Sequence, residues 1–218
     1  PLMATKKKPT PKQQDPMQAE AHELALAKLE TSGLTEADMR LLRMEALSPT
    51  QTHALHESFK PLCSLKITYW DPTDMNKPLS GHAAWPAFYR LRYLRPGGDA
   101  KDDVRYTNEP MAGVVAYFPP SVDWPSIVGD YNQTLIITEG ELKAAKACKE
   151  GCPTIGLGGV WNFRSSSLGV TFLRELEAFN WVKRRVYIMF DSDVIVKPGV
   201  QDALNSLAEE LMLRGALP

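Results

Sequence analysis

Cysteine is scarce in this chain of 218 residues, which contains only three. An odd number of cysteines suits a reducing compartment better than a fold held by disulfides. Cys148 and Cys152 form a C-x₃-C pair, but no second Cys/His pair lies at finger spacing, so a zinc site is not expected. We expect Cys148 to pack within a helix and Cys152 to lie in the loop that follows.

Long apolar runs are also missing. No segment is apolar over the length that a bilayer requires, and no signal-peptide pattern is present. The hydrophobic content of 44% and charged content of 23% are ordinary for a soluble globular protein. We therefore expect a cytoplasmic protein without a membrane partner, folded as one large or two small domains.

An excess of positive charge is the third absence, because the formal net charge is −1. This balance neither indicates nor excludes nucleic-acid binding, since the local distribution of charge decides it. Basic residues do cluster at residues 6–8, 90–95 and 183–185. Each cluster is equally typical of a solvated surface or a disordered tail.

Carboxylates follow two short apolar runs. Leu135–Thr138 is followed by Glu139, Gly140 and Glu141, and Val186–Phe190 is followed by Asp191, Ser192 and Asp193. In an open α/β sheet, ligands bind beyond the carboxyl ends of the strands, so Glu139, Asp191 and Asp193 are expected to share one edge. Three carboxylates there require a cation, and oxygen ligands suit Mg²⁺ or Mn²⁺. The alternative is that these residues only cap helices, which fits Glu141 best.

The second half of the chain predicts a β-α-β passage with a parallel sheet. The expected strands are 135–138, 154–157 and 185–190, and the expected helices are 141–150, 168–179 and 200–214. In the last helix the inward side should carry Ala203, Leu204, Leu207, Leu211 and Met212. The glycine-rich turn at 158–159 could approach a phosphate or simply form a turn, but it lacks the Lys-Ser/Thr ending of a nucleotide-triphosphate loop.

The first half predicts a different architecture. Residues 1–15 indicate a disordered tail whose Pro1-Leu2 resembles a cloning remnant. Residues 16–130 predict three short helices followed by an antiparallel sheet, with the helices at 16–33, 35–47 and 48–55 and the strands at 65–70, 87–94, 104–106 and 114–118. Arg90 and Arg92 should share one face of this sheet. Interleaved with Tyr69, Tyr89, Tyr93 and Tyr106, they could hold phosphates and stack on bases, or form a half-buried sheet with a solvated basic face.

Read together, ITEGELKA and MFDSDV resemble a Toprim domain, in which Glu-Gly ends the first strand and Asp-x-Asp ends a later one. That fold occurs in bacterial-type primases, type IA and type II topoisomerases and some nucleases. The resemblance is closer to the Toprim-like domains of phage and plasmid replication proteins, often fused to a helicase, which read EGExKA, IGLxGVWNW and FDSD. Here the corresponding segments are Glu139–Ala144, Ile155–Phe163 and Phe190–Asp193. SGLTEADMRLLRMEALSP, residues 32–49, also resembles the start of that domain.

The resemblance implies a DNA primase-type nucleotidyltransferase that makes primers on single-stranded DNA from nucleoside triphosphates, beside a replicative helicase. Glu139, Asp191 and Asp193 would be catalytic and would hold Mg²⁺ or Mn²⁺, with Glu139 a ligand or general acid/base. Phosphates and nucleic acid would contact the basic set Lys143, Arg90, Arg92, Lys183, Arg184 and Arg185.

Two other functions remain open: a Toprim nuclease or strand-cleaving enzyme, and a non-catalytic DNA-binding or helicase-docking module. No zinc ribbon of the kind many primases use is visible. Residues 131–218 would form the Toprim-like domain, and we expect it to stop just short of its last strand. Whether ribonucleotides or deoxyribonucleotides would be used stays open.

Overall fold

The structure, a computed structural model, describes residues 16–81, 86–191 and 197–218. The tail expected over residues 1–15 and the carboxylate of Asp193 lie outside these ranges. None of the described helices is long and apolar enough to span a membrane.

A parallel sheet of three strands forms the second half of the chain, in the order β8-β7-β9. The strands are β7 (Leu135–Glu139), β8 (Thr154–Leu157) and β9 (Val186–Met189). Helix α5 (Glu141–Lys149) connects β7 to β8, so the expected β-α-β passage is confirmed. After β8 come a 3₁₀ helix (Ser166–Leu168), α6 (Arg174–Glu177) and, beyond β9, α7 (Pro198–Leu213).

An antiparallel sheet in the order β1-β2-β5-β6 forms the first half, as predicted. Its strands are β1 (Glu45–Leu47), β2 (Ser64–Thr68), β5 (Tyr89–Tyr93) and β6 (Tyr106–Thr107). A separate hairpin pairs β3 (Trp70–Asp71) with β4 (Asp74–Pro78). The mixed α/β architecture is therefore a parallel-sheet part preceded by a helical and antiparallel part.

Local sequence signals set the helix starts of the first half. The helices there are α1 (Pro16–Glu30), α2 (Glu36–Leu41) and α3 (Pro49–Leu55), and α4 (Trp124–Gly129) precedes the parallel sheet. Thr35 and Ser48 each form a capping box with the third helical residue, which satisfies free N–H groups at the helix start. Pro49 follows Ser48 at the first helical position, where its missing N–H costs nothing.

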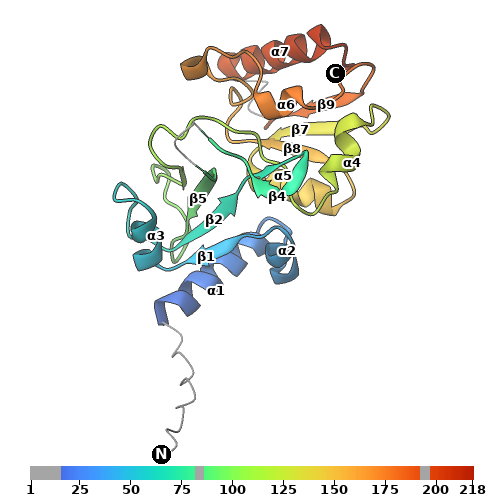
Figure 1. The fold of residues 1–218 in the computed structure, drawn as a ribbon. Helices are drawn as coiled ribbons and strands as arrows, with labels where there is room; N and C mark the ends of the chain where they lie inside the picture. The colour runs from blue at the N-terminus through green and yellow to red at the C-terminus, as the bar shows by residue number, and fades with distance from the viewer. Residues whose placement is uncertain (1–15, 82–85, 192–196) are drawn as a thin grey trace, which may run out of the picture.

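Figure 1 shows α7 at one end of the molecule and α1 at the other, with the parallel sheet and α5 between them. One side of α5 lies on the parallel sheet. The other faces the N-terminal elements, where the Lys149 Nζ donates to the Gly33 carbonyl at 3.3 Å and pairs with Asp38 at 2.7 Å. A single cluster of buried apolar side chains runs from Ala21 in α1 to Ala216 after α7. The two halves therefore share one core.

Three predicted elements were wrong. The second helix ends at Leu41 rather than Leu47, because Arg43 adopts a left-handed φ of 53° and residues 45–47 pair with β2 as strand β1. Residues 168–179 form only the four-residue α6, since Gly169 ends the 3₁₀ helix in a left-handed conformation and Val170 bridges back to Ser165. Residues 114–118 contribute one antiparallel bridge, from Tyr117 to Gly156, instead of a strand.

The last helix follows its prediction more closely. Ala203, Leu207 and Leu211 are fully buried, but Met212 is 54% exposed and does not face the core. Beyond α7, Leu217 forms a parallel bridge with Arg185 at the outer edge of β9.

Arg184 is buried, which contradicts its predicted role in binding phosphate. Its guanidinium donates to the backbone carbonyls of Asn180 and Ile127 at 2.8 and 2.9 Å, and to those of Val128 and Gln133 at 3.1 and 3.4 Å. The side chain is 0% exposed, so no phosphate can reach it. These hydrogen bonds instead hold the chain before β9 against α4.

We expect Arg184→Met to lower the free energy of unfolding by about 3 kcal/mol, because four backbone carbonyls would each lose a hydrogen bond from the guanidinium. Urea denaturation followed by circular dichroism measures this change. The exposed neighbour provides a control, since Arg185→Met should change stability by less than about 0.5 kcal/mol. Equal effects of the two substitutions would contradict the structural role assigned to Arg184.

Candidate functional site

The carboxyl ends of β7 and β9 lie side by side. Thr138 stands opposite Met189 in the parallel register, and its hydroxyl donates to the Met189 carbonyl at 2.7 Å. Glu139 is the last residue of β7, and Asp191 follows β9 by two residues. Both side chains line one cavity of about 390 Å³. The structure thus brings together two of the three predicted carboxylates, and Asp193 lies outside the described residues.

Lys143 joins the same cavity from the first turn of α5. Its ammonium group forms an ion pair with Asp191 Oδ1. The two side chains are 53% and 54% exposed, so this pair stands in contact with solvent. Helix α5 can begin directly after β7 because Gly140 adopts a φ of 94°, which a side chain would make unfavourable.

Cationic side chains from the first half of the chain form the opposite wall of the cavity. They are Lys28 of α1, Arg92 of β5 and Arg105, which precedes β6. Burial, helped by Arg92, lowers the pKa of Lys28. A nearby anion would stabilise the protonated amine and so offset this lowering of its pKa. No sequence signal pointed to Lys28 or Arg105, because only the tertiary fold brings α1 and the residues before β6 to the acidic edge.

Tyr106 lies between two arginines on this wall. The Arg90 and Arg92 guanidinium carbons lie 4.9 and 5.2 Å from the centre of its ring. Burial, followed by the charge of Glu141, raises the pKa of Tyr106 to about 12, so its phenol stays protonated. Arg90 and Arg92 therefore share a face, as their spacing predicted.

Arg92 itself is held by an ion pair within the protein. Its side chain is 6% exposed, and it pairs with Asp99, which also contacts Arg95 at 3.3 Å and Arg105 at 3.8 Å. The hydrogen bond from Arg92 and the surrounding positive charges hold the pKa of Asp99 below its usual value. Arg92 thus contributes charge to the wall, while Lys28 and Arg105 carry the more accessible groups.

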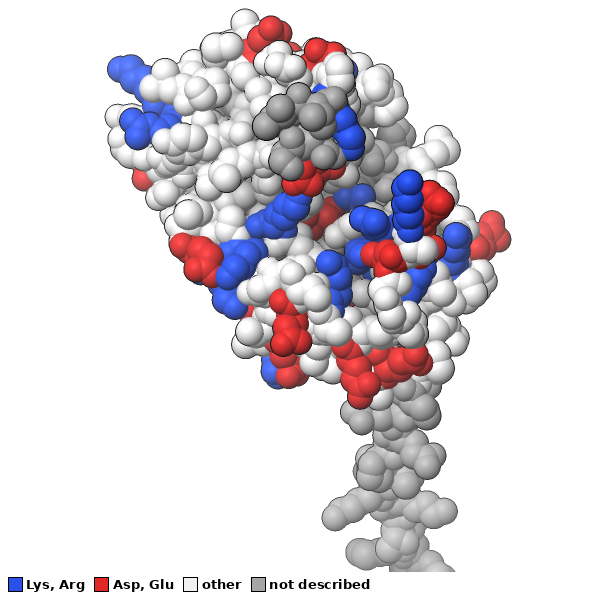
Figure 2. Space-filling model, turned by 180° about the vertical axis from the view of Figure 1, so that it is seen from behind, with Lys and Arg blue, Asp and Glu red and all other residues white. Residues whose placement is uncertain are grey.

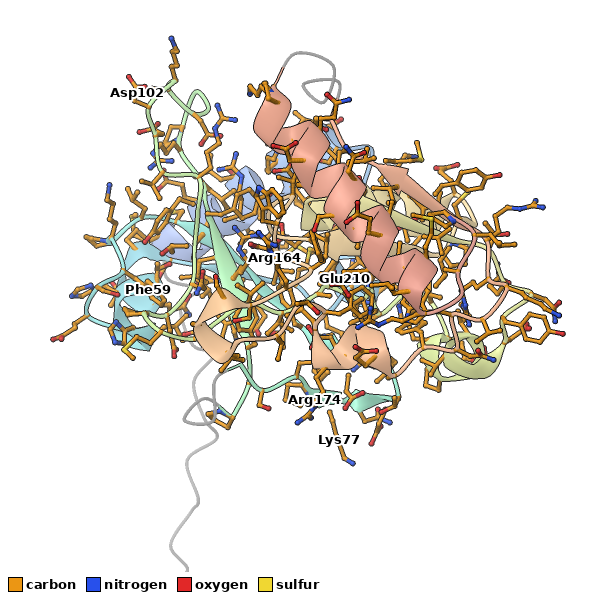
Figure 3. All side chains as sticks on the ribbon, turned by 90° about the horizontal axis from the view of Figure 1, so that it is seen from above. Phe59, Lys77, Asp102, Arg164, Arg174 and Glu210 are labelled. Carbon is orange, nitrogen blue, oxygen red and sulfur yellow. The ribbon has the colours of Figure 1, made fainter. Side chains whose placement is uncertain are left out.

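A second cavity of about 330 Å³ shares Lys28 and Arg92 with the first. Its other side is the loop at residues 97–99, which includes Gly97 and Gly98 with φ of 78° and 91°. Figure 3 shows Asp102 near the tip of this loop, away from the body of the molecule. The cavity at the acidic edge therefore adjoins a second cavity through Lys28 and Arg92.

The surface charge is locally uneven despite the net charge of −1. Figure 2 shows Lys and Arg side chains in a band across the middle of one face, with Asp and Glu among them. Such a band could follow a phosphate backbone over a short distance.

Glu141, for which the sequence favoured a helix-capping role, is almost completely buried at 1% exposure. Its Oε1 accepts hydrogen bonds from Arg90 Nη1 and from the Tyr69 hydroxyl, both at 2.5 Å. Burial alone would lower the pKa of Arg90, but the neighbouring Glu141 carboxylate raises it overall. Burial and the same carboxylate raise the pKa of Tyr69, which keeps its hydroxyl a donor.

Arg90 is therefore a structural partner of Glu141 in this structure, not an open phosphate contact as predicted. Its Nη1 also donates to the Gly158 carbonyl at 3.2 Å. A Cβ at Gly158 would lie 2.4 Å from that nitrogen, so the glycine leaves space for the guanidinium. This explains one glycine of the turn at 158–159 without a phosphate.

The remaining predicted residues lie elsewhere. Lys183 and Arg185 are exposed but precede β9, at the opposite end of the strand from Asp191. Tyr69 and Tyr93 are 0% and 2% exposed, so the prediction that they could stack on bases is wrong. The Tyr89 hydroxyl donates a hydrogen bond to the Glu109 carboxylate.

The donors at the acidic edge suit a hard cation. Glu139 and Asp191 present carboxylate oxygens, which Mg²⁺ and Mn²⁺ prefer, and the Lys143 ammonium already acts as a cation beside Asp191. Within the described ranges no three Asp, Glu, His or Cys side chains converge on one point. The third expected ligand, Asp193, is not among those residues.

Residues 123–217 match a family model described as "Domain of unknown function (DUF3854)". The match covers α4 and the whole parallel sheet, including the acidic edge, but less than half of the chain. No curated protein matches the chain. A solved structure described as "Structure of the DnaG primase catalytic domain bound to ssDNA" is 13% identical, covers 88% of this chain and 75% of that one, and has a TM-score of 0.42. A likeness this distant assigns no function.

We expect Glu141→Gln to lower the free energy of unfolding by about 3 to 5 kcal/mol, because the Arg90 charge would remain in a largely buried site without its partner. The double variant Glu141→Leu/Arg90→Met should recover most of that loss, since apolar side chains replace both charges. Urea denaturation of Glu141→Leu, Arg90→Met and the double variant measures the coupling. Additive losses would show that the two side chains act independently.

Proposed function

We propose that this chain is a primase-type Toprim nucleotidyltransferase of a phage or plasmid replication protein, which makes primers on single-stranded DNA. The observation that carries the proposal is one cavity that is lined by the carboxylates of Glu139 and Asp191, by Lys143 beside them, and by Lys28, Arg92 and Arg105 on the opposite wall. Carboxylates and cations opposed across one hollow suit a substrate that carries both phosphates and a metal ion. The motif resemblance at residues 139–144 and 190–193 supports the same reaction.

Nucleotidyl transfer requires that a 3′-hydroxyl attack the α-phosphorus of a nucleoside triphosphate while pyrophosphate leaves. In this proposal Lys28, Arg105 and Lys143 bind the phosphate oxygens and stabilise the charge on the leaving group. Glu139 either accepts the proton of the attacking hydroxyl or serves as a metal ligand. A divalent cation held by Glu139, Asp191 and Asp193 would neutralise charge on the phosphates and orient them.

The template strand would follow the basic wall. Lys28 and Arg92 line both cavities, so a phosphodiester backbone passing over them would run beside the acidic edge. Phosphate contacts of this kind position a strand without reading its sequence.

We expect labelled nucleotides and Mg²⁺ on single-stranded DNA to give labelled oligomers with the wild-type chain. Asp191→Asn, alone or with Asp193→Asn, should reduce the product at least about 100-fold, because a ligating carboxylate supplies several kcal/mol of charge stabilisation. Asp202→Asn makes the same chemical change at an exposed position of α7 and should leave the yield unchanged.

Two other outcomes would replace the proposal. Metal-dependent cutting of DNA without nucleotides would indicate a Toprim nuclease. Intact binding of single-stranded DNA with no product from any variant would indicate a docking or DNA-binding module.

A separate prediction concerns the role of the basic wall in binding single-stranded DNA. Lys28→Met/Arg105→Met should weaken the affinity for single-stranded DNA and reduce the steepness of its salt dependence by about 0.7 for each phosphate that the variant no longer neutralises. Fluorescence anisotropy between about 50 and 200 mM salt measures both quantities. Lys101→Met/Lys183→Met removes two exposed charges that line neither cavity and serves as the control. The same change in slope in both variants would contradict a specific role for the wall.

A further inference from the structure

The ion pair between Lys143 and Asp191 connects two separate elements at the acidic edge. Lys143 belongs to the first turn of α5, whereas Asp191 follows β9, 48 residues later in the chain. Glu139 lines the cavity with them. The ammonium group therefore lies where the proposed cation and the substrate phosphates would also have to lie.

We infer that Lys143 is an exchangeable counter-ion for this edge. It neutralises Asp191 while no divalent cation is bound, and it turns to a substrate phosphate once a cation takes its place. This inference rests on the proposed function, because it assigns a second role to a residue of the same site.

The exposure of the pair allows such an exchange. Both side chains are more than half exposed, and an ion pair in contact with solvent contributes only about 0 to 1 kcal/mol. A divalent cation can therefore displace the ammonium at little energetic cost. Lysine suits this role because its charge is compact and its chain is flexible, whereas arginine would form a more rigid two-pronged contact with a carboxylate.

The other two lysines of α5 have different partners. Lys146 pairs with Glu150 on the same helix, and Lys149 pairs with Asp38 of α2. Neither lines the cavity of the acidic edge. Lys143 is thus the lysine of α5 that can exchange between Asp191 and a phosphate.

Opposite changes in two affinities distinguish an exchangeable counter-ion from a structural ion pair. Removal of a positive charge beside Asp191 should strengthen the binding of a divalent cation. The same removal should weaken the binding of a polyphosphate, which needs that charge. Removal of a purely structural ion pair would weaken both or change neither.

The experiment compares Lys143→Met with the wild type and with Lys146→Met, which removes the same charge one turn further along α5. Mn²⁺ alone is titrated and followed by electron paramagnetic resonance, and inorganic tripolyphosphate alone is titrated in the presence of a chelator by calorimetry. We expect Lys143→Met to bind Mn²⁺ about 5-fold more tightly and tripolyphosphate about 5-fold more weakly, as a screened unit charge at short range implies. Lys146→Met should change either affinity by less than about 2-fold.

Lys143→Arg keeps the charge, so it should not bind Mn²⁺ more tightly than the wild type. If Lys143→Met binds Mn²⁺ with unchanged or lower affinity, the exchange is overturned, while Mn²⁺ binding that depends on Asp191 would leave the proposed function standing. If the wild type binds no Mn²⁺, the metal-dependent function fails and the exchange fails with it.

Discussion

The buried ion pair between Glu141 and Arg90 is the contact on which the geometry of the candidate site depends. Moving two charges out of water costs several kcal/mol for each ion, and only close hydrogen bonds offset that cost. Glu141 Oε1 accepts from both Arg90 and Tyr69 at 2.5 Å, while its Oε2 is buried without a partner among the described residues. The pair is therefore stable only in a narrow range of geometries, and this requirement fixes α5 against β5 in one arrangement.

This arrangement determines how the two walls of the cavity face each other. Glu139 and Lys143 each stand two residues from Glu141, on the side of the parallel sheet. Arg90 stacks on Tyr106 and lies two residues before Arg92 on β5, so it adjoins the basic wall from behind the cavity lining. Small residues allow the close approach: Gly158 leaves space for Arg90, and a Cβ at Gly156 would meet Ala144 of α5 at 3.1 Å. A local shift of α5 would thus displace side chains on both walls of the cavity.

Short-range signals made much of the fold predictable. Ser48-Pro49 predicted the start of α3, and apolar runs followed by Glu139 and by Asp191 predicted two parallel strands and their shared edge. The second half of the site could not be read from the sequence, because Lys28 and Arg105 reach the acidic edge only through tertiary packing. Burial also reversed two interpretations. Arg184 looks like part of an exposed basic run but donates to backbone carbonyls, and Glu141 looks like a helix-start residue but is an almost fully buried carboxylate paired with Arg90. Sequence spacing shows which residues share one face of a helix or strand, whereas packing against distant segments of the chain decides whether that face is buried.

The basic wall contains acidic residues of its own. Arg92, Arg95 and Arg105 surround Asp99, and Arg95 also contacts Asp103 at 3.3 Å, so part of the positive charge is neutralised within the wall. This internal pairing holds the arginines in fixed positions, which favours an oriented contact over a diffuse attraction. It also leaves only a modest surplus of positive charge, chiefly from Lys28 and the exposed Arg105, to attract a polyanion. In the proposed reaction a divalent cation at the acidic edge would therefore strengthen phosphate binding, because Glu139 and Asp191 repel the phosphates that the opposite wall attracts and Lys143 neutralises only one of the two carboxylates.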